Sequence, residues 1–169
     1  AAINLNIFNR HCDRVVMANL AQTVNVLQAV ILTEGDQMVL TPTYHVFDLY
    51  KAHQDAKEVD CFVTSDETGD ETHKMGQLTA SASEKEGKVT LTVANLSADE
   101  KAETAVAIRA KEIAGVSARI LNGEMHQYND FGKTHVEVQP FTDYEVLANG
   151  EMKLNLPPCS VAEVTVCLK

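Results

Sequence analysis

The feature that most constrains the fold is a regular alternation of apolar and polar residues beyond residue 57. Successive side chains of a β-strand point to opposite faces, so a period of two predicts strands with one buried and one polar face. The alternation is clearest at residues 89–93, 106–108, 136–138, 152–156 and 164–168, and residues 59–64, 78–83 and 116–121 have a similar character. Turn-forming pairs occur at Glu86-Gly87, Asn122-Gly123 and Asn149-Gly150. About eight short strands separated by turns predict a mainly β chain with an antiparallel β-sandwich of the jelly-roll type.

The first third of the chain has a different pattern. Ile3 and Ile7 lie at helical spacing and Arg10 comes near the end of this segment, which predicts the last part of a helix. Residues 14–18 are short and rich in β-branched side chains, as in a strand buried on both faces of a parallel barrel, although a buried helix has the same pattern.

A connection and a second helix are predicted next. Residues 29–33 and 37–40 are short apolar segments on either side of Glu34-Gly35-Asp36, which favours a tight connection. Thr41-Pro42 is typical of a helix start, because threonine caps well and proline fits the first helical position. The helix is expected to end near His53, with Val46, Leu49, Tyr50 and His53 on its buried side. We place the domain boundary between residues 1–56 and 57–169.

Composition and charge exclude several classes of function. The formal net charge of -10 repels a phosphate backbone, so we expect no nucleic-acid partner. The most apolar stretch, residues 15–32, carries four amide side chains, which argues against a membrane span. No secretory signal is visible at the start of the chain, and a cytoplasmic location is favoured.

The cysteines give no indication of a metal site or a disulfide framework. There is no C-x-x-C pair and no histidine at zinc-ligand spacing from the four cysteines, Cys12, Cys61, Cys159 and Cys167. If Cys159 and Cys167 share one strand, they lie about 26 Å apart, beyond disulfide reach. We therefore expect reduced cysteines, no metal and no cofactor.

Catalytic motifs are also missing from the sequence. The acidic pairs Asp66-Glu67 and Asp70-Glu71 fall in a polar stretch, residues 65–76, that we expect to be an exposed loop. Nothing apolar there would desolvate one carboxyl and raise its pKa, as a catalytic acid requires. The neighbours His11 and Cys12 would point apart at a helix end. We predict no catalytic residue within these 169 residues.

Four amides recur every three positions, at Asn19, Gln22, Asn25 and Gln28. Buried amides need hydrogen-bond partners. One interpretation is that they bind backbone groups at the edge of a core. The other is that one or two of them face a polar ligand such as a sugar.

Longer stretches identify a family. Residues 11–28, from His11-Cys12-Asp13-Arg14 to Val26-Leu27-Gln28, together with residues 40–47, resemble the end of the catalytic barrel of family 51 glycoside hydrolases, the α-L-arabinofuranosidases. Residues 156–161, Leu-Pro-Pro-Cys-Ser-Val, resemble the same family near its C-terminus. The similarity is dense over residues 3–56 and looser beyond.

The resemblance implies a role for each part of the chain. Residues 1–56 would be the C-terminal end of a (β/α)8 barrel, and residues 57–169 a C-terminal jelly-roll domain. Active sites of such barrels lie at the C-terminal ends of the strands. Gln22 matches the family's glutamine that hydrogen-bonds the arabinofuranose in the -1 subsite, and Asn19 is its neighbour near the strand end.

The resemblance also implies that the catalytic machinery lies elsewhere. The family is retaining and uses two glutamates whose carboxyls lie about 5 to 5.5 Å apart. The chain has no Trp and no Asn-Glu pair, so neither glutamate motif is present and both are expected upstream of residue 1. The parent enzyme would remove terminal α-L-arabinofuranosyl residues from saccharides as a homo-oligomer, and this fragment alone would be inactive. The alternative is an autonomous carbohydrate-binding or protein-interaction β-sandwich.

Overall fold

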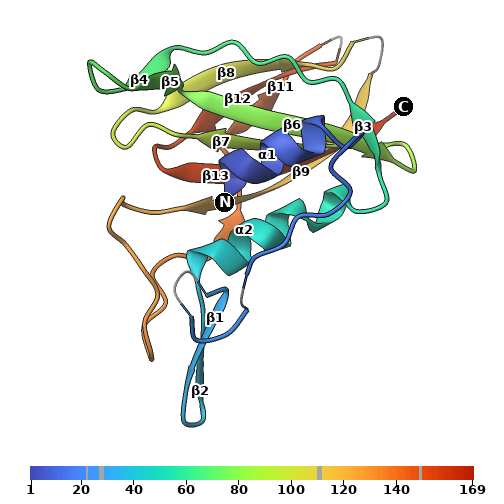
Figure 1. The fold of residues 1–169 in the computed structure, drawn as a ribbon. Coiled ribbons are helices and arrows are strands. Elements are labelled where there is room, and N and C mark those ends of the chain that lie inside the picture. The colour runs from blue at the N-terminus through green and yellow to red at the C-terminus, as the bar shows by residue number, and fades with distance from the viewer. Residues whose placement is uncertain (22, 27–28, 110–111, 149) are drawn as a thin grey trace.

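A computed structural model describes residues 1–21, 23–26, 29–109, 112–148 and 150–169 (Figure 1). Its helices are α1 (Ala2–Arg10), α2 (Pro42–Tyr50) and the short 3-10 helix η1 (Lys51–His53). Its strands are β1 (Ile31–Glu34), β2 (Gln37–Leu40), β3 (Lys57–Val59), β4 (Glu67–Gly69), β5 (Lys74–Gly76), β6 (Leu78–Lys85), β7 (Lys88–Asn95), β8 (Ala102–Ala107), β9 (Ile113–Asn122), β10 (Val138–Pro140), β11 (Tyr144–Val146), β12 (Glu151–Leu156) and β13 (Ser160–Leu168). None of these helices is long and apolar enough to cross a membrane.

Two antiparallel sheets pack face to face beyond residue 57. The larger has six strands in the order β10-β9-β13-β7-β6-β3, and the smaller has three in the order β11-β12-β8. Leu91 and Val164 of the larger sheet share one core with Leu154 of the smaller. The prediction of a mainly β chain with antiparallel sheets is confirmed.

The period of two in the sequence has its expected structural meaning. On β12, Met152, Leu154 and Leu156 are fully buried, whereas Lys153 between them is exposed. Each buried side chain of this kind contributes roughly 1.5 to 3 kcal/mol to folding. The hydrophobic effect therefore selects which face of β12 turns toward the other sheet.

The predicted turn at Glu86-Gly87 joins β6 to β7. Both residues have positive φ, 53° at Glu86 and 76° at Gly87, which is the pattern of a type I′ hairpin turn. The backbone N–H of Gly87 also donates to the Glu84 carboxylate at 2.8 Å. Glycine at the second position lowers the conformational energy of this turn, because it has no Cβ that would clash with the backbone at positive φ.

The helices cover the outer face of the larger sheet (Figure 1). Leu5 of α1 and Leu49 of α2 pack with Ala94 and Leu121 of the sheet in a second apolar cluster. Arg119 on β9 links α2 to the sheet. Its Nε donates a hydrogen bond to the Glu163 carboxylate at 2.8 Å, and its Nη1 donates one to the Asp48 carboxylate of α2 at 3.0 Å. A hydrogen bond from Lys51, with a further one from Arg119, holds the pKa of Asp48 below its usual value despite partial burial.

The predicted second helix and the connection before it are present. The helix is α2 followed by η1, and Val46, Leu49 and Tyr50 are buried on its inner side while His53 is half-buried. The connection is the hairpin β1–β2, which projects from the rest of the molecule (Figure 1).

Two local predictions were wrong. Residues 15–20 form no regular secondary structure, although residues 14–18 were expected to be a strand. A strand gains its hydrogen bonds from a neighbour, and the described chain places none beside this segment. Within the acidic stretch, β4 and β5 pair as a small hairpin, because Gly69, at φ 125°, allows the chain to turn back.

Candidate functional site

Of the four amides singled out in the sequence, Asn19 and Asn25 are among the described residues. Gln22 and Gln28 fall outside the described residues. Asn19 is exposed, and so is Asn25, whose φ of 55° puts it in the left-handed region. The Asn25 side chain donates from Nδ2 to Thr33 Oγ1 at 2.8 Å and accepts from the Thr33 N–H at 2.6 Å. Asn25 therefore bonds to one backbone group and one side chain of the hairpin β1–β2, in an exposed position and not at the edge of a core.

Residues 23–26 and the hairpin are joined by backbone hydrogen bonds as well. The N–H groups of Val30 and Ile31 donate to the Thr23 carbonyl at 3.1 and 3.0 Å, and the Asn25 N–H donates to the Ile31 carbonyl at 3.1 Å. Val24 and Ile31 form a parallel bridge. The segment that directly follows Gln22 in the sequence is thus part of the hairpin unit.

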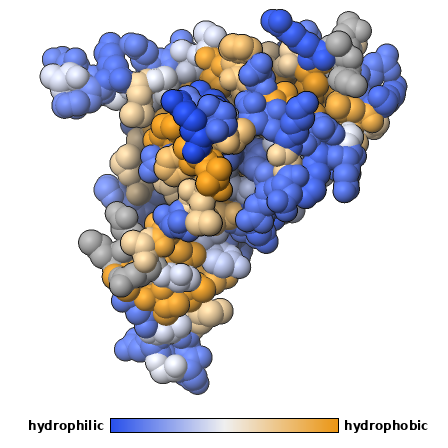
Figure 2. All heavy atoms as spheres, turned by 45° about the vertical axis from the view of Figure 1, so that its right-hand side comes forward, coloured by the Kyte–Doolittle hydropathy of each residue, from blue (hydrophilic) through white to orange (hydrophobic). Residues whose placement is uncertain are grey.

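Several apolar side chains in the first third of the chain are exposed. Val16 is 92% exposed and Met17 is 71% exposed, and Ile7 and Phe8 of α1 are also exposed. Figure 2 shows apolar surface in the middle of one face and again toward the base of the projecting hairpin. Contiguous apolar surface of this kind marks an interaction site more often than a plain solvent face.

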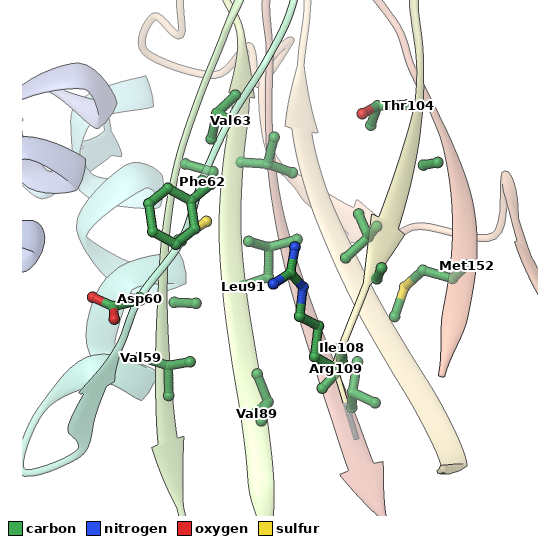
Figure 3. A pocket seen from close by; sticks show the side chains of 18 of the residues that line it. Val59, Asp60, Phe62, Val63, Val89, Leu91, Thr104, Ile108, Arg109 and Met152 are labelled. Atoms are coloured by element: carbon green, nitrogen blue, oxygen red, sulfur yellow. The ribbon is translucent and has the colours of Figure 1, made fainter. Parts of the chain in front are cut away.

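A cavity of about 600 Å³ lies between the two sheets (Figure 3). Apolar residues of β6 and β7, such as Ala80 and Leu91, form its floor. Its two walls are residues 59–64 and residues 104–109. The cavity exists because the three-stranded sheet covers only part of the six-stranded one.

The cavity does not have the chemistry of a glycosidase site. Of the described residues that line it, Asp60 alone carries a carboxyl, so no carboxylate pair is assembled there. Burial raises the pKa of the Cys61 thiol, and the charge of Arg10 lowers it by a smaller amount. Because the pKa is raised overall, the thiol stays protonated and weakly nucleophilic. Arg109 and the exposed Phe62 lie at the cavity but bring no acid or base (Figure 3).

The remaining sequence candidates are solvated, as expected. Asp66, Glu67, Asp70 and Glu71 are all exposed. Hydrogen bonds from the Thr72 side chain and backbone, and then from His73, lower the pKa of Asp70 to about 2. Asp70 is therefore a carboxylate at neutral pH and unsuited to act as a general acid. Cys12 is exposed, and the His11 ring contacts Arg14, with 3.3 Å between Nδ1 and Nη2.

A buried polar cluster beneath the helices was not recognised as such in the sequence. The Asn6 carbonyl oxygen accepts from Tyr50 Oη at 2.8 Å, from Ser81 Oγ at 2.9 Å and from Thr92 Oγ1 at 3.1 Å. Asn6 is fully buried, and its Nδ2 has no partner among the described residues. These residues come from α1, α2, β6 and β7, so the cluster joins the helical layer to the sheet.

His53 is the histidine of this cluster. Its Nδ1 lies 2.7 Å from Ser83 Oγ and its Nε2 lies 2.9 Å from Thr92 Oγ1. A neutral imidazole has one donor and one acceptor nitrogen, and hydroxyls can satisfy both. Burial lowers the pKa of His53 to about 4, so the ring is neutral at physiological pH. The helical spacing in the sequence placed His53 on the buried side of α2, but the hydroxyls that meet it are distant in the sequence.

Comparison with known proteins identifies the family. A family model described as the α-L-arabinofuranosidase C-terminal domain matches residues 1–160. An intracellular exo-α-L-arabinofuranosidase of Bacteroides ovatus is 38% identical over 166 residues, which are 95% of this chain and 32% of that protein.

Solved structures give the same result. The family 51 arabinofuranosidase of Xanthomonas axonopodis pv. citri is 36% identical, with a TM-score of 0.92 over 98% of this chain and 34% of that one. The α-L-arabinofuranosidase of Thermotoga maritima, 22% identical with a TM-score of 0.81 over 98% of this chain and 37% of its own, shares the fold. The chain spans about a third of the length of these relatives. It belongs to the α-L-arabinofuranosidase C-terminal domain family and corresponds to the C-terminal portion of a family 51 glycoside hydrolase.

Proposed function

We propose that this chain is the C-terminal part of a retaining α-L-arabinofuranosidase that removes terminal α-L-arabinofuranosyl residues from arabinose-containing polysaccharides and oligosaccharides. The observation that carries the proposal is the 38% identity, over 95% of this chain, to a relative named an intracellular exo-α-L-arabinofuranosidase. The name of that relative also supports an intracellular location. In a retaining enzyme one glutamate protonates the leaving oxygen and the other attacks the anomeric carbon. Both glutamates belong to the part of the enzyme that precedes residue 1.

We further propose that residues 1–56 complete a (β/α)8 barrel and that residues 57–169 form a sandwich of the jelly-roll type that supports it. The exposure of Val16 and Met17 supports this division, because the other units of a barrel would cover apolar side chains that are exposed in this chain. The exposed apolar residues of α1, Ile3, Ile7 and Phe8, would pack against other barrel helices in the same way. The sandwich would then hold the end of the barrel in place through the polar cluster and the Arg119 ion pairs.

Gln22 is the one residue of this chain to which we assign a substrate contact. The family resemblance of residues 11–28 supports the assignment, and Gln22 comes directly before the segment bonded to the hairpin β1–β2. Its amide would hydrogen-bond a hydroxyl of the arabinofuranose in the -1 subsite. The enzyme is expected to act as a homo-oligomer without nucleic acid, membrane, metal or cofactor.

The test uses the full-length protein that contains this chain and an aryl α-L-arabinofuranoside. We expect hydrolysis, and proton NMR should show the α-anomer of arabinofuranose as the first product, because two inversions retain configuration. First formation of the β-anomer, or no hydrolysis, would overturn the proposal. Isothermal titration of this chain alone with arabino-oligosaccharides tests the alternative, since millimolar or tighter binding would indicate an autonomous carbohydrate-binding module.

A further inference from the structure

The long connection between β9 and β10, residues 123–137, reaches from the sandwich to the base of the hairpin β1–β2. Asn129 in this connection is 5% exposed and all of its side-chain hydrogen-bonding capacity is used. Its Oδ1 accepts from the N–H groups of His135 and Val136 at 2.9 and 2.8 Å. Its Nδ2 donates to the carbonyls of Val136 at 2.7 Å and of Leu40 at 2.8 Å. Three of these four bonds stay within the connection, and the fourth goes to the hairpin.

Leu40 is the point where the hairpin ends and α2 is about to begin. It pairs with Ile31 across the hairpin, so an anchor on Leu40 also fixes the start of β1. The next residue, Thr41, reinforces this base: its Oγ1 lies 3.0 Å from the carbonyls of both Ala29 and Val30, and its N–H donates to Val30 at 3.1 Å.

From β1 the hydrogen bonds continue to the segment that follows Gln22. Ile31 is bonded to Thr23 and Asn25 through backbone groups, and Thr33 is bonded to the Asn25 side chain. A continuous set of hydrogen bonds therefore leads from the sandwich, through Leu40 and the hairpin, to residues 23–25. The connection contributes one buried side chain to this set, that of Asn129.

We infer that Asn129 is a positioning residue, through which the sandwich fixes the hairpin β1–β2 and thereby residues 23–25, which directly follow the proposed substrate contact Gln22 in the sequence. This inference rests on the proposed function for the role of Gln22, whereas the anchoring itself rests on the hydrogen bonds of Asn129. It assigns the β9–β10 connection a part in the reaction, although the connection belongs to the sandwich.

The amide chemistry of asparagine is needed at this position. A carboxylate of the same size accepts from His135 and Val136 but has no N–H to donate, and its charge would face the carbonyls of Leu40 and Val136. Asn129→Asp therefore removes the bond to Leu40 together with the bond to the Val136 carbonyl, and it keeps the two acceptor bonds within the connection.

Asn95 offers a matched control. It is equally buried and donates from Nδ2 to the carbonyls of Glu100, Leu156 and Pro157, while Oδ1 accepts from the Ser97 N–H. Asn95→Asp makes the same chemical change, but the groups it affects, among them Leu156 at the end of β12, all belong to the sandwich.

The experiment measures amide hydrogen exchange and kinetics in the full-length protein. For Asn129→Asp we expect about tenfold faster exchange at Asn25, Ile31 and Thr33 with the β7 and β13 amides unchanged, as the loss of the hydrogen bond to Leu40 implies. Asn95→Asp should leave the exchange of the Asn25, Ile31 and Thr33 amides at the wild-type rates. Wild-type exchange of these amides in Asn129→Asp, or equal acceleration in both variants, would overturn the inference.

Kinetics separate a positioning role from a structural one. If Asn129 acts through Gln22, Asn129→Asp lowers kcat/KM about tenfold, and this effect disappears when Gln22 is already alanine. A full additional loss in the double variant would contradict the inference. If Gln22→Ala alone retains wild-type kinetics, the proposed substrate contact fails instead, and the exchange measurement still decides whether Asn129 anchors the hairpin.

Discussion

The buried His53 makes the attachment of the helices to the sheet sensitive to pH. In the folded protein its pKa is about 4, because burial disfavours the charged ring. In the unfolded chain the ring is solvated and its pKa is about 6.5. Between these two values the unfolded state binds more protons than the folded state, so stability rises with pH. The contribution of His53 is fully present above about pH 6.5 and is lost as the pH falls toward 4.

The size of the effect follows from this difference. Each pKa unit corresponds to about 1.4 kcal/mol, so a folded pKa of about 4 gives a total of roughly 3 kcal/mol. At pH 5 the unfolded ring is almost fully protonated and the folded ring mostly neutral. We therefore expect the free energy of unfolding to be about 2 kcal/mol lower at pH 5 than at pH 8 from this group alone.

Urea unfolding at a series of pH values measures this contribution, with the His53→Gln variant as the reference. The variant lacks the imidazole and should lose about 2 kcal/mol of the difference between pH 8 and pH 5. His126→Gln, which removes an exposed imidazole, should retain the wild-type slope. An unchanged pH dependence in His53→Gln would refute the reasoning, because it would mean that the folded protein binds the proton as readily as the unfolded chain does.

Two further predictions concern Gln22 and the exposed apolar residues. In the full-length enzyme, Gln22→Ala should lower kcat/KM about ten- to hundredfold through the loss of a hydrogen bond to a sugar hydroxyl, and unchanged kinetics with a large fall in Tm would make Gln22 a structural residue instead. The isolated chain should either self-associate or exchange its amides rapidly over residues 14–32, because Val16 and Met17 are largely exposed. Light scattering of a strict monomer together with slow exchange over that range would contradict this expectation.

Most of the sandwich was predictable because its longer strands each have a recognisable pattern in the sequence. The period of two on β12 indicates directly which side chains are buried, and the Glu86-Gly87 turn follows from the need for positive φ. The sequence does not reveal β11 in the same way, because Tyr144–Val146 is too short for a period to be visible.

Contacts between distant segments were the part that sequence patterns could not supply. Thr92 alternates with apolar neighbours and is predicted only to face away from the core between the sheets, yet this face meets Asn6 and His53 under the helices. The hydrogen bond from Asn129 to Leu40 joins residues 89 positions apart, and neither has a local pattern that indicates it. The strand expected at residues 14–18 failed for a related reason, since a buried strand depends on neighbours that the pattern of one segment cannot provide.

The central claim is that this chain belongs to an α-L-arabinofuranosidase whose catalytic glutamates lie outside it. The most direct test compares the purified chain with the full-length protein on the same aryl α-L-arabinofuranoside. We predict steady turnover by the full-length protein and none by the isolated chain, because the solvated carboxylates around Asp70 cannot replace a nucleophile and a desolvated acid. Steady turnover by the isolated chain, free of host enzyme, would contradict the claim, and so would an inactive full-length protein.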